Sequence, residues 1–261
     1  MPERFERFLE GIPIGKYREE LTPVKTVEQD LKIPGHDLNP LPLIYRLYWE
    51  NQGDFPDFEK FFETYWKEHL SGIDEFIGKY FWGCSRDFVR LGFKARLYRT
   101  WAPVLTQFHF AYLWKEVCKS SLEASAEMDR AGTDFRIYHP KARTVDISFK
   151  KISRRREASE RRFPVSQVES KTVELVYTLE SFKDKEDFLK KMGRAKSKTS
   201  RLEYCIAFHL QRNLKNGFVV FREDYPMRVE KALPALIKTI GTDLIHWQTA
   251  MEFILKDCLP K

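Results

Sequence analysis

The spacing of apolar side chains along this chain changes near its middle. Up to about residue 127 they recur every three or four residues, as on the buried face of an amphipathic helix. The second half carries short runs of β-branched and aromatic residues instead, which predict strands at 133–138, 144–150, 172–179 and 217–223. We expect three helices in this half, at 198–216, about 226–239 and about 241–258.

The first half is expected to hold the longest helices. Prolines interrupt residues 1–55, so short helical pieces of this segment should wrap over other elements. From Pro56, the stretch "PDFEKFFETYWKEHLSGIDEFIGKYFWG" carries an aromatic stripe at helical spacing, with Asp57 as a start signal and Gly83 near the end. Such a stripe is more often core than a ligand cage. A second helical region follows and is expected to break at Pro103.

Composition bounds the class of protein. With 261 residues and 43% hydrophobic content, the chain can build a sizeable core. Its cysteines and histidines show no zinc-binding spacing, and no glycine-rich phosphate loop is present, so we expect no nucleotide cofactor. No apolar run is long enough for a membrane span and the charged start is not a secretory signal, so a cytoplasmic protein is expected.

The formal charge of +7 favours an anionic partner, and its distribution is more informative than its total. Residues 150–171 hold eight Lys or Arg against three Glu. This segment is either a solvated loop or an arm that grips DNA phosphates, with a guanidinium also able to read guanine. Basic "GRAKSKTSR" at 193–201 could continue the surface. The candidate DNA contacts are Arg154, Arg155, Arg156, Arg161, Arg162, Lys196, Lys198 and Arg201.

Charged residues also stand inside the predicted strands at 133–138 and 144–150. In "TVDISFK", alternation would place Val145, Ile147 and Phe149 on one face and the polar residues on the other, as on any half-solvated strand. A second interpretation is catalytic. Asp134, with Lys150 sixteen residues later at the end of the next strand, could hold Mg²⁺ and orient a nucleophile at a phosphodiester.

The order helix, strand, strand, strand, helix, strand, with these two residues, resembles the core of the PD-(D/E)XK nucleases. Longer strings carry a narrower resemblance. "KTVEQDL", "NPLP", "FPDFE", "DEFIGKYFWGCS", "FVRLG", "ARLYRT", "TQFHF", "NGFVVFRE" and "LIHW" resemble, in order and over nearly the whole chain, the TaqI family of type II restriction endonucleases. The resemblance implies a homodimeric, Mg²⁺-dependent enzyme of a restriction-modification system that cuts double-stranded DNA at the palindrome TCGA, after T.

The resemblance also implies site residues. The family's acidic stretch matches "EMDRAGTD", which brings forward Asp129 and Asp134 with Glu127 alongside, and its lysine pair matches Lys150 and Lys151. Alternation favours Lys150. Ser148 departs from the nuclease pattern, because it stands where an acid would precede x-Lys. Another carboxylate must then supply the charge, and the sequence does not choose between Glu127, Asp129 and Glu174.

The expected fold is therefore α/β, with a PD-(D/E)XK-like nuclease core whose mixed central sheet is flanked by helices. We expect a helical N-terminal region over 1–104, the catalytic core over 105–225 and C-terminal helices over 226–261. The missing acid at Ser148 leaves a second interpretation open, a catalytically silent DNA-binding protein on the same fold. An RNA-binding module would need stacking aromatics on a sheet face, whereas most aromatics here lie on predicted helices.

Overall fold

The computed structural model describes residues 1–27, 31–51, 53–152, 170–239 and 243–258, which fall into two compact units. The first unit comprises Glu3–Phe108 and Lys215–Phe218, and the second His109–Leu214 and Val219–Lys261. The long helix α6 (Arg86–Val117) contributes to both units. In the described part of the chain, no helix is long and apolar enough to cross a membrane. The four cysteines are free, as their scatter predicts.

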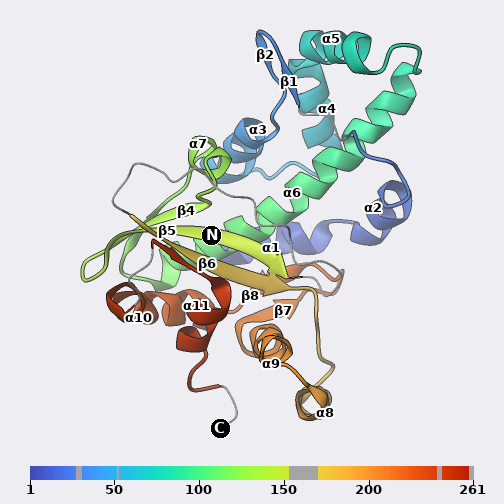
Figure 1. Ribbon diagram of the computed structural model, residues 1–261. Coiled ribbons are helices and arrows are strands. Elements are labelled where there is room, and N and C mark those ends of the chain that lie inside the picture. Colours follow the sequence, from blue (N-terminus) through green and yellow to red (C-terminus); the bar gives the residue numbers. More distant parts are fainter. Residues whose placement is uncertain (28–30, 52, 153–169, 240–242, 259–261) are drawn as a thin grey trace. The chain divides into compact units, whose positions relative to one another are not determined.

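The first unit is helical, as predicted (Figure 1). Its elements are α1 (Pro2–Gly11), α2 (Ile14–Leu21), the ribbon β1 (Lys32–Ile33) and β2 (His36–Asp37), α3 (Leu41–Tyr45), the π-helical turn η1 (Arg46–Glu50), α4 (Phe58–Glu68), α5 (Leu70–Tyr80) and the start of α6. Asp57 caps α4 by accepting from the Lys60 amide at 2.8 Å, which confirms the predicted start signal.

The aromatic stripe of α4 forms the core of this unit, as predicted. Phe58 and Trp101 are completely buried, with ring centroids 5.2 Å apart. Tyr17 packs edge-on against Phe58 and Tyr48 against Trp101, so the segment before residue 55 covers α4 and α6. The stripe does not run along one helix, however. His69 leaves helical geometry (φ −106°, ψ 14°) and separates α4 from α5.

The predicted break at Pro103 is wrong, because α6 continues through it from Arg86 to Val117. Proline lacks an amide hydrogen and costs the helix one backbone bond. The buried side chains of Trp101 and Leu105 on either side offset that loss. The helix ends at Val117, and the chain then forms β3 (Ser121–Glu123) and the short helix α7 (Ala126–Arg130).

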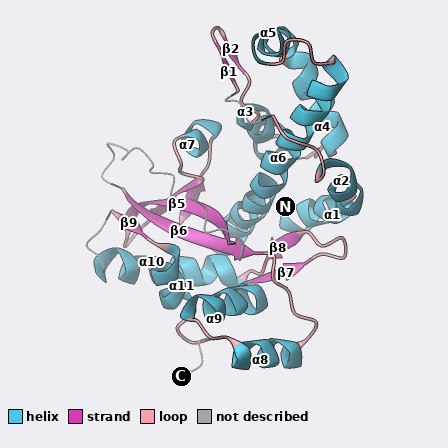
Figure 2. Ribbon diagram, turned by 45° about the vertical axis from the view of Figure 1, so that its right-hand side comes forward, coloured by secondary structure: helices cyan, strands magenta, loops and turns pink. Residues whose placement is uncertain are grey.

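A mixed five-stranded sheet in the order β3-β4-β5-β6-β9 is the centre of the second unit (Figures 1 and 2). Its other strands are β4 (Phe135–His139), β5 (Arg143–Ile152), β6 (Lys171–Thr178) and β9 (Leu244–Ile245). The first three strands in that order are antiparallel, and β5, β6 and β9 are parallel. Flanking helices are α8 (Lys185–Arg194), α9 (Lys198–Cys205) with the π-turn η2 (Ile206–Leu210), α10 (Asp224–Thr239) and α11 (Trp247–Ile254). The predicted α/β class is confirmed.

One face of this sheet is an aromatic core. Phe135 and Phe149, from neighbouring strands, lie with ring centroids 6.0 Å apart. Phe110 of α6 packs edge-on against Phe149 at 4.8 Å, and Tyr225 of α10 packs against both Phe110 and Phe149. The apolar half of the alternation in β5 therefore faces helices, which leaves the polar half on the opposite face of the sheet.

All four predicted strands exist, but the last is not part of the central sheet. β8 (Val219–Phe221) pairs with β7 (Gln211–Asn213) in a separate ribbon, closed by a turn in which Gly217 has φ +85°. The predicted helix at 198–216 consequently ends at Leu210. The two-residue strand β9 pairs with β6 as the fifth strand of the sheet, so α11 begins later than expected, at Trp247.

Side chains complete the edge of β6 beyond β9. β9 pairs only with Thr172 and Val173, so the following backbone groups of β6 need other partners. The Tyr225 hydroxyl accepts from the Val176 amide at 3.2 Å and donates to its carbonyl at 2.9 Å. The Gln211 carboxamide bonds the Thr178 amide and carbonyl in the same manner, at 3.1 and 2.7 Å. The edge is thereby buried without a further strand.

Candidate active site

Three polar residues form one row across the neighbouring strands β4, β5 and β6. Asp134 directly precedes β4, whose first pair with β5 is Phe135–Ile147, and continuing that antiparallel register by one residue sets Asp134 beside Ser148. Its amide donates to the Ile147 carbonyl at 2.9 Å. Ser148 is in turn the partner of Glu174. Residues opposite one another share a face of the sheet. Asp134, Ser148 and Glu174, which we call the polar row, therefore lie on the face away from the aromatic core.

The polar row is buried. Relative exposure is 8% for Asp134, 4% for Ser148 and 2% for Glu174. A half-solvated strand would hold these side chains in water, so that interpretation of β5 is excluded by the structure. Burying a carboxylate is costly unless it is paired or binds a metal.

The position of Asp134 depends on the turn that precedes β4. Gly132 adopts φ +93°, which glycine tolerates without strain, and its amide donates to the Asp129 carbonyl at 2.9 Å at the end of α7. The Asp134 carboxylate then accepts from the Phe149 amide at 2.5 Å. Burial raises the pKa of Tyr177, and the charge of Asp134 raises it further, so the Tyr177 hydroxyl stays neutral.

Lys150 completes the arrangement. It stands two residues after Ser148 and so faces the same way, and its ammonium forms an ion pair with Glu174 Oε1. The Lys150 side chain keeps 35% of its surface exposed, which leaves it within reach of a bound substrate. Lys151, in contrast, is the partner of Tyr177 and belongs to the opposite face, where it is exposed at the end of β5.

The structure does not bring Glu127 and Asp129 into the polar row. Both belong to α7, where Glu127 is exposed and Asp129 is half-buried. Among the described residues, no three or more His, Cys, Asp or Glu side chains are grouped closely enough to hold a metal ion together. Mg²⁺, however, typically binds one or two carboxylates and takes its remaining oxygen ligands from water and substrate phosphates. The oxygen donors of Asp134 and Glu174 fit that requirement.

A buried ion pair next to the polar row was missed at the sequence level. Asp146 is buried on the same face of β5, and its carboxylate accepts from Arg136 Nε at 2.7 Å and Arg136 Nη2 at 3.1 Å. Ser170, the first described residue after Ile152, donates to the same carboxylate at 2.7 Å. The sequence could have indicated this ion pair, because Arg136 and Asp146 become direct cross-strand partners once the two predicted strands are aligned as a hairpin.

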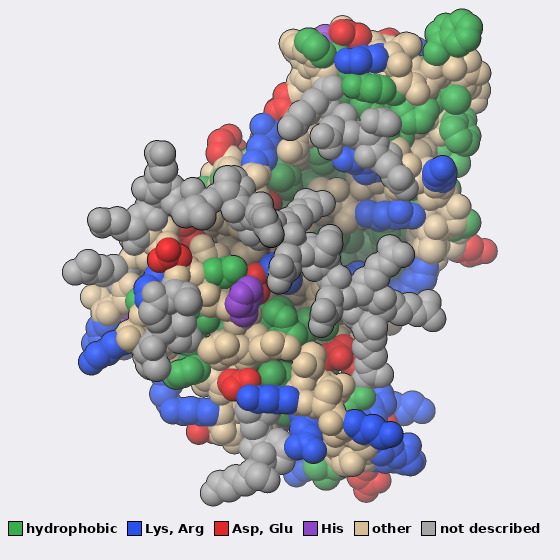
Figure 3. Space-filling view, in the orientation of Figure 1, with side chains coloured by type: hydrophobic (Ala, Val, Ile, Leu, Met, Phe, Trp, Pro, Cys, Tyr) green, Lys and Arg blue, Asp and Glu red, His purple; other side chains and the backbone are tan. Residues whose placement is uncertain are grey.

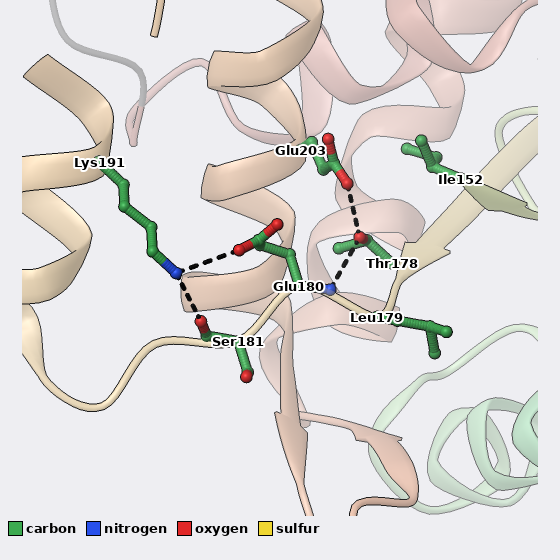
Figure 4. A pocket seen from close by; sticks show the side chains of 7 residues that line it. All are labelled: Ile152, Thr178, Leu179, Glu180, Ser181, Lys191 and Glu203. Atoms are coloured by element: carbon green, nitrogen blue, oxygen red, sulfur yellow. Dashed lines mark hydrogen bonds and ion pairs between the residues drawn. The ribbon is translucent and has the colours of Figure 1, made fainter. Parts of the chain in front are cut away.

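A pocket lies beyond the carboxyl ends of β5 and β6 (Figure 4). Its charged residues are already paired: Glu180 bonds Lys191 at 3.1 Å, and the buried Glu203 accepts from the Thr178 hydroxyl at 2.8 Å. Its lining consists of Ile152, Thr178, Leu179, Glu180, Ser181, Lys191 and Glu203. No sequence motif pointed to these residues.

Basic side chains gather over α8 and α9 (Figure 3). Of the candidates there, Lys196 is exposed, Lys198 bonds Glu252 at 2.7 Å while remaining 71% exposed, and Arg201 donates to the Ala195 carbonyl at 3.4 Å. They share the second unit with the polar row. The other candidates, Arg154, Arg155, Arg156, Arg161 and Arg162, lie outside the described residues.

A mixed sheet that presents buried carboxylates and a lysine from adjacent strands is the core of a PD-(D/E)XK-like nuclease. Comparison with known proteins agrees, because the model of the TaqI restriction endonuclease family matches residues 2–233. The chain is 44% identical over 254 residues to the type II restriction enzyme TaqI of Thermus aquaticus, covering 96% of this chain and 94% of that protein. It is also 44% identical to the type II restriction enzyme TthHB8I of Thermus thermophilus, over 94% and 92% of the two chains. No solved structure matches. The chain belongs to the TaqI restriction endonuclease family.

Proposed function

We propose that this chain is a type II restriction endonuclease that makes Mg²⁺-dependent double-strand cuts in DNA at the palindrome TCGA, after T. The observation that carries the proposal is the polar row, with Lys150 paired to Glu174 at its β6 end. The names of both relatives support site-specific cleavage of DNA. Since its substrate is DNA within the cell, we place the enzyme in the cytoplasm and assign it no nucleotide cofactor.

In this proposal Asp134 and Glu174 hold the metal ion. Mg²⁺, when bound, lowers the pKa of the attacking water and neutralises charge on the scissile phosphate. Lys150 orients that water and stabilises the charge that develops on the phosphate oxygens. Glu174 supplies the carboxylate that the nuclease pattern would place at position 148, because Glu174 and Ser148 are direct cross-strand partners. We retain Glu127 and Asp129 as essential carboxylates that act from α7, and Lys151 as a minor contributor.

The described residues of each chain carry one polar row, whereas a palindromic site has two equivalent scissile phosphates. A homodimer whose two-fold axis coincides with that of the DNA presents the same residues to each strand. DNA affinity is proposed to come from Arg154, Arg155, Arg156, Arg161 and Arg162, together with Lys196, Lys198 and Arg201. Replacing any one phosphate-binding side chain by Ala should reduce the slope of log K against log salt by roughly 0.9.

A plasmid with mapped TCGA sites tests the function. Wild-type enzyme with Mg²⁺ should give fragments that end at those sites, and chelation of Mg²⁺ should abolish them. Fragments ending elsewhere would refute the specificity but leave the nuclease intact. Binding to the plasmid without any cleavage would instead support the silent DNA-binding protein, for which the missing acid at Ser148 is the strongest argument.

A further inference from the structure

The segment "LIHW" brings a fourth residue to the polar row. β9 pairs in parallel with β6 through Thr172–Leu244 and Val173–Ile245, so the next position sets His246 beside Glu174. The backbone of His246 is still extended (φ −62°, ψ 146°), and α11 begins directly after it, at Trp247. The match to the family model ends at residue 233, before both of these elements.

The two oxygens of Glu174 have different partners. Oε1 pairs with the Lys150 ammonium, on the side of β5. Oε2 accepts from the Trp247 amide at 3.2 Å and lies 3.4 Å from His246 Nδ1, on the side of α11. A carboxylate at a helix N-terminus is stabilised by the free amides and the helix dipole. Glu174 is therefore held from both sides of β6.

The imidazole of His246 contributes little to the packing of this unit. Its side chain is 63% exposed, and it makes no capping hydrogen bond to α11, although His246 occupies the N-cap position. A side chain that stabilises a helix as its N-cap does so by accepting from a first-turn amide, which His246 does not do. The close approach to Glu174 is the specific contact that the imidazole makes here.

We infer that His246 is a positioning residue of the active site, which fixes Glu174 through Nδ1 so that Oε1 stays aligned for the metal and Lys150. The inference rests on the proposed function, since it assigns Glu174 to the metal. A neutral imidazole can donate to a carboxylate from Nδ1 only in the tautomer that carries its hydrogen there. Outer partners that orient a metal-binding carboxylate typically change metal affinity or activity by about 10 to 100-fold.

The test compares His246→Ala, His246→Asn and His246→Gln, with His36→Ala as a matched control. His36 also lies near a surface carboxylate, 3.6 Å from Glu75, but in the first unit. We expect His246→Ala to raise the Mg²⁺ concentration for half-maximal cleavage by about 10 to 100-fold, with the KM for DNA unchanged. His246→Asn should bring the Mg²⁺ requirement most of the way back to the wild-type value, because the amide nitrogen of Asn occupies the place of Nδ1. His246→Gln should not.

A second readout does not depend on cleavage. Ca²⁺ should strengthen binding of a fluorescent TCGA duplex, and His246→Ala should shift that Ca²⁺ dependence upward by a similar factor, while thermal unfolding remains unchanged. Normal Mg²⁺ and Ca²⁺ dependence in His246→Ala, or equal effects of Ala, Asn and Gln, would overturn the inference. Failure of the wild-type enzyme to cut would refute the proposed function instead, and the Ca²⁺ dependence would still decide the role of His246.

Discussion

The assignment of Glu174 as the displaced acid of the nuclease pattern makes a strong prediction. Glu174→Gln keeps the shape of the side chain and its acceptor for the Trp247 amide, but removes the charge that faces Lys150. Ser148→Glu in the same chain then moves a carboxylate one strand across, to the position that the general pattern prescribes. Neighbouring strands are about 4.8 Å apart, a distance that a glutamate side chain can partly cover.

The expected magnitudes follow from the burial of these groups. Loss of one of two carboxylates at a metal site should cost about 3 to 4 kcal/mol of transition-state stabilisation, or roughly two to three orders of magnitude in rate. The stability of the fold should change much less. Lys150 is about one-third exposed, and water can solvate its ammonium when its partner is neutral. The free energy of unfolding should therefore fall by about 1 kcal/mol, and the melting temperature by roughly 2 to 4 °C.

Single-turnover cleavage of a TCGA duplex, with binding measured separately in Ca²⁺, is the suitable assay. The double variant should cut at least about tenfold faster than Glu174→Gln, which corresponds to about 1.4 kcal/mol. Glu180→Gln is the matched control, because Glu180 also pairs with a lysine, Lys191 at 3.1 Å, but outside the polar row. If Glu174→Gln cuts within tenfold of wild type, Glu174 is not a metal ligand and the reasoning fails.

Four further predictions can be tested with the same protein. Asp134→Asn should reduce cleavage by about two to three orders of magnitude while DNA binding in Ca²⁺ persists, and near-normal cleavage would contradict its role. Lys150→Ala should impair cleavage far more than Lys151→Ala, and the reverse order would mean that the other face of β5 is catalytic. The two hydrogens of the Asn216 side-chain amide are shared among three carbonyls at the end of α1, so Asn216→Ala should lower the free energy of unfolding in urea by about 1 to 3 kcal/mol. Burial raises the pKa of Glu230, but hydrogen bonds from the turn before β3 lower it more, to a net value below normal. The stability that the Glu230 carboxylate contributes to the fold should be complete above about pH 4.3 and disappear at lower pH. Glu230→Gln should flatten that part of a plot of the urea unfolding midpoint against pH.

The sequence predicts the faces of the strands well because alternation is a local property. Period-two spacing in β5 separates Phe149 from Lys150 whatever the rest of the chain does, and the structure confirms that separation. The same reasoning fails for β9, since two residues carry no period and pairing with β6 alone defines it. It also fails at Leu210, where apolar spacing continues but the backbone leaves the helix to form β7.

The displaced acid could not be chosen from the sequence for a related reason. Which residue of β6 lies beside Ser148 depends on the register of two parallel strands, and their connection is long. A shift of one residue would turn Glu174 to the aromatic face. From the sequence alone, Glu127 and Asp129 are equally acceptable candidates, because sequence distance says little about distance in space.

The location of Glu174 near the edge of the sheet explains why the C-terminal part of the chain matters for the site. A strand edge is usually a poor place for a metal ligand, because unpaired backbone groups leave it free to move. Here the Tyr225 hydroxyl and the Gln211 carboxamide replace a neighbouring strand, and the Trp247 amide holds the carboxylate itself. These three partners lie between 37 and 73 residues after Glu174 in the sequence. Under the proposed assignment of Glu174, moving the acid from β5 to β6 therefore requires support from α10, α11 and the start of β7.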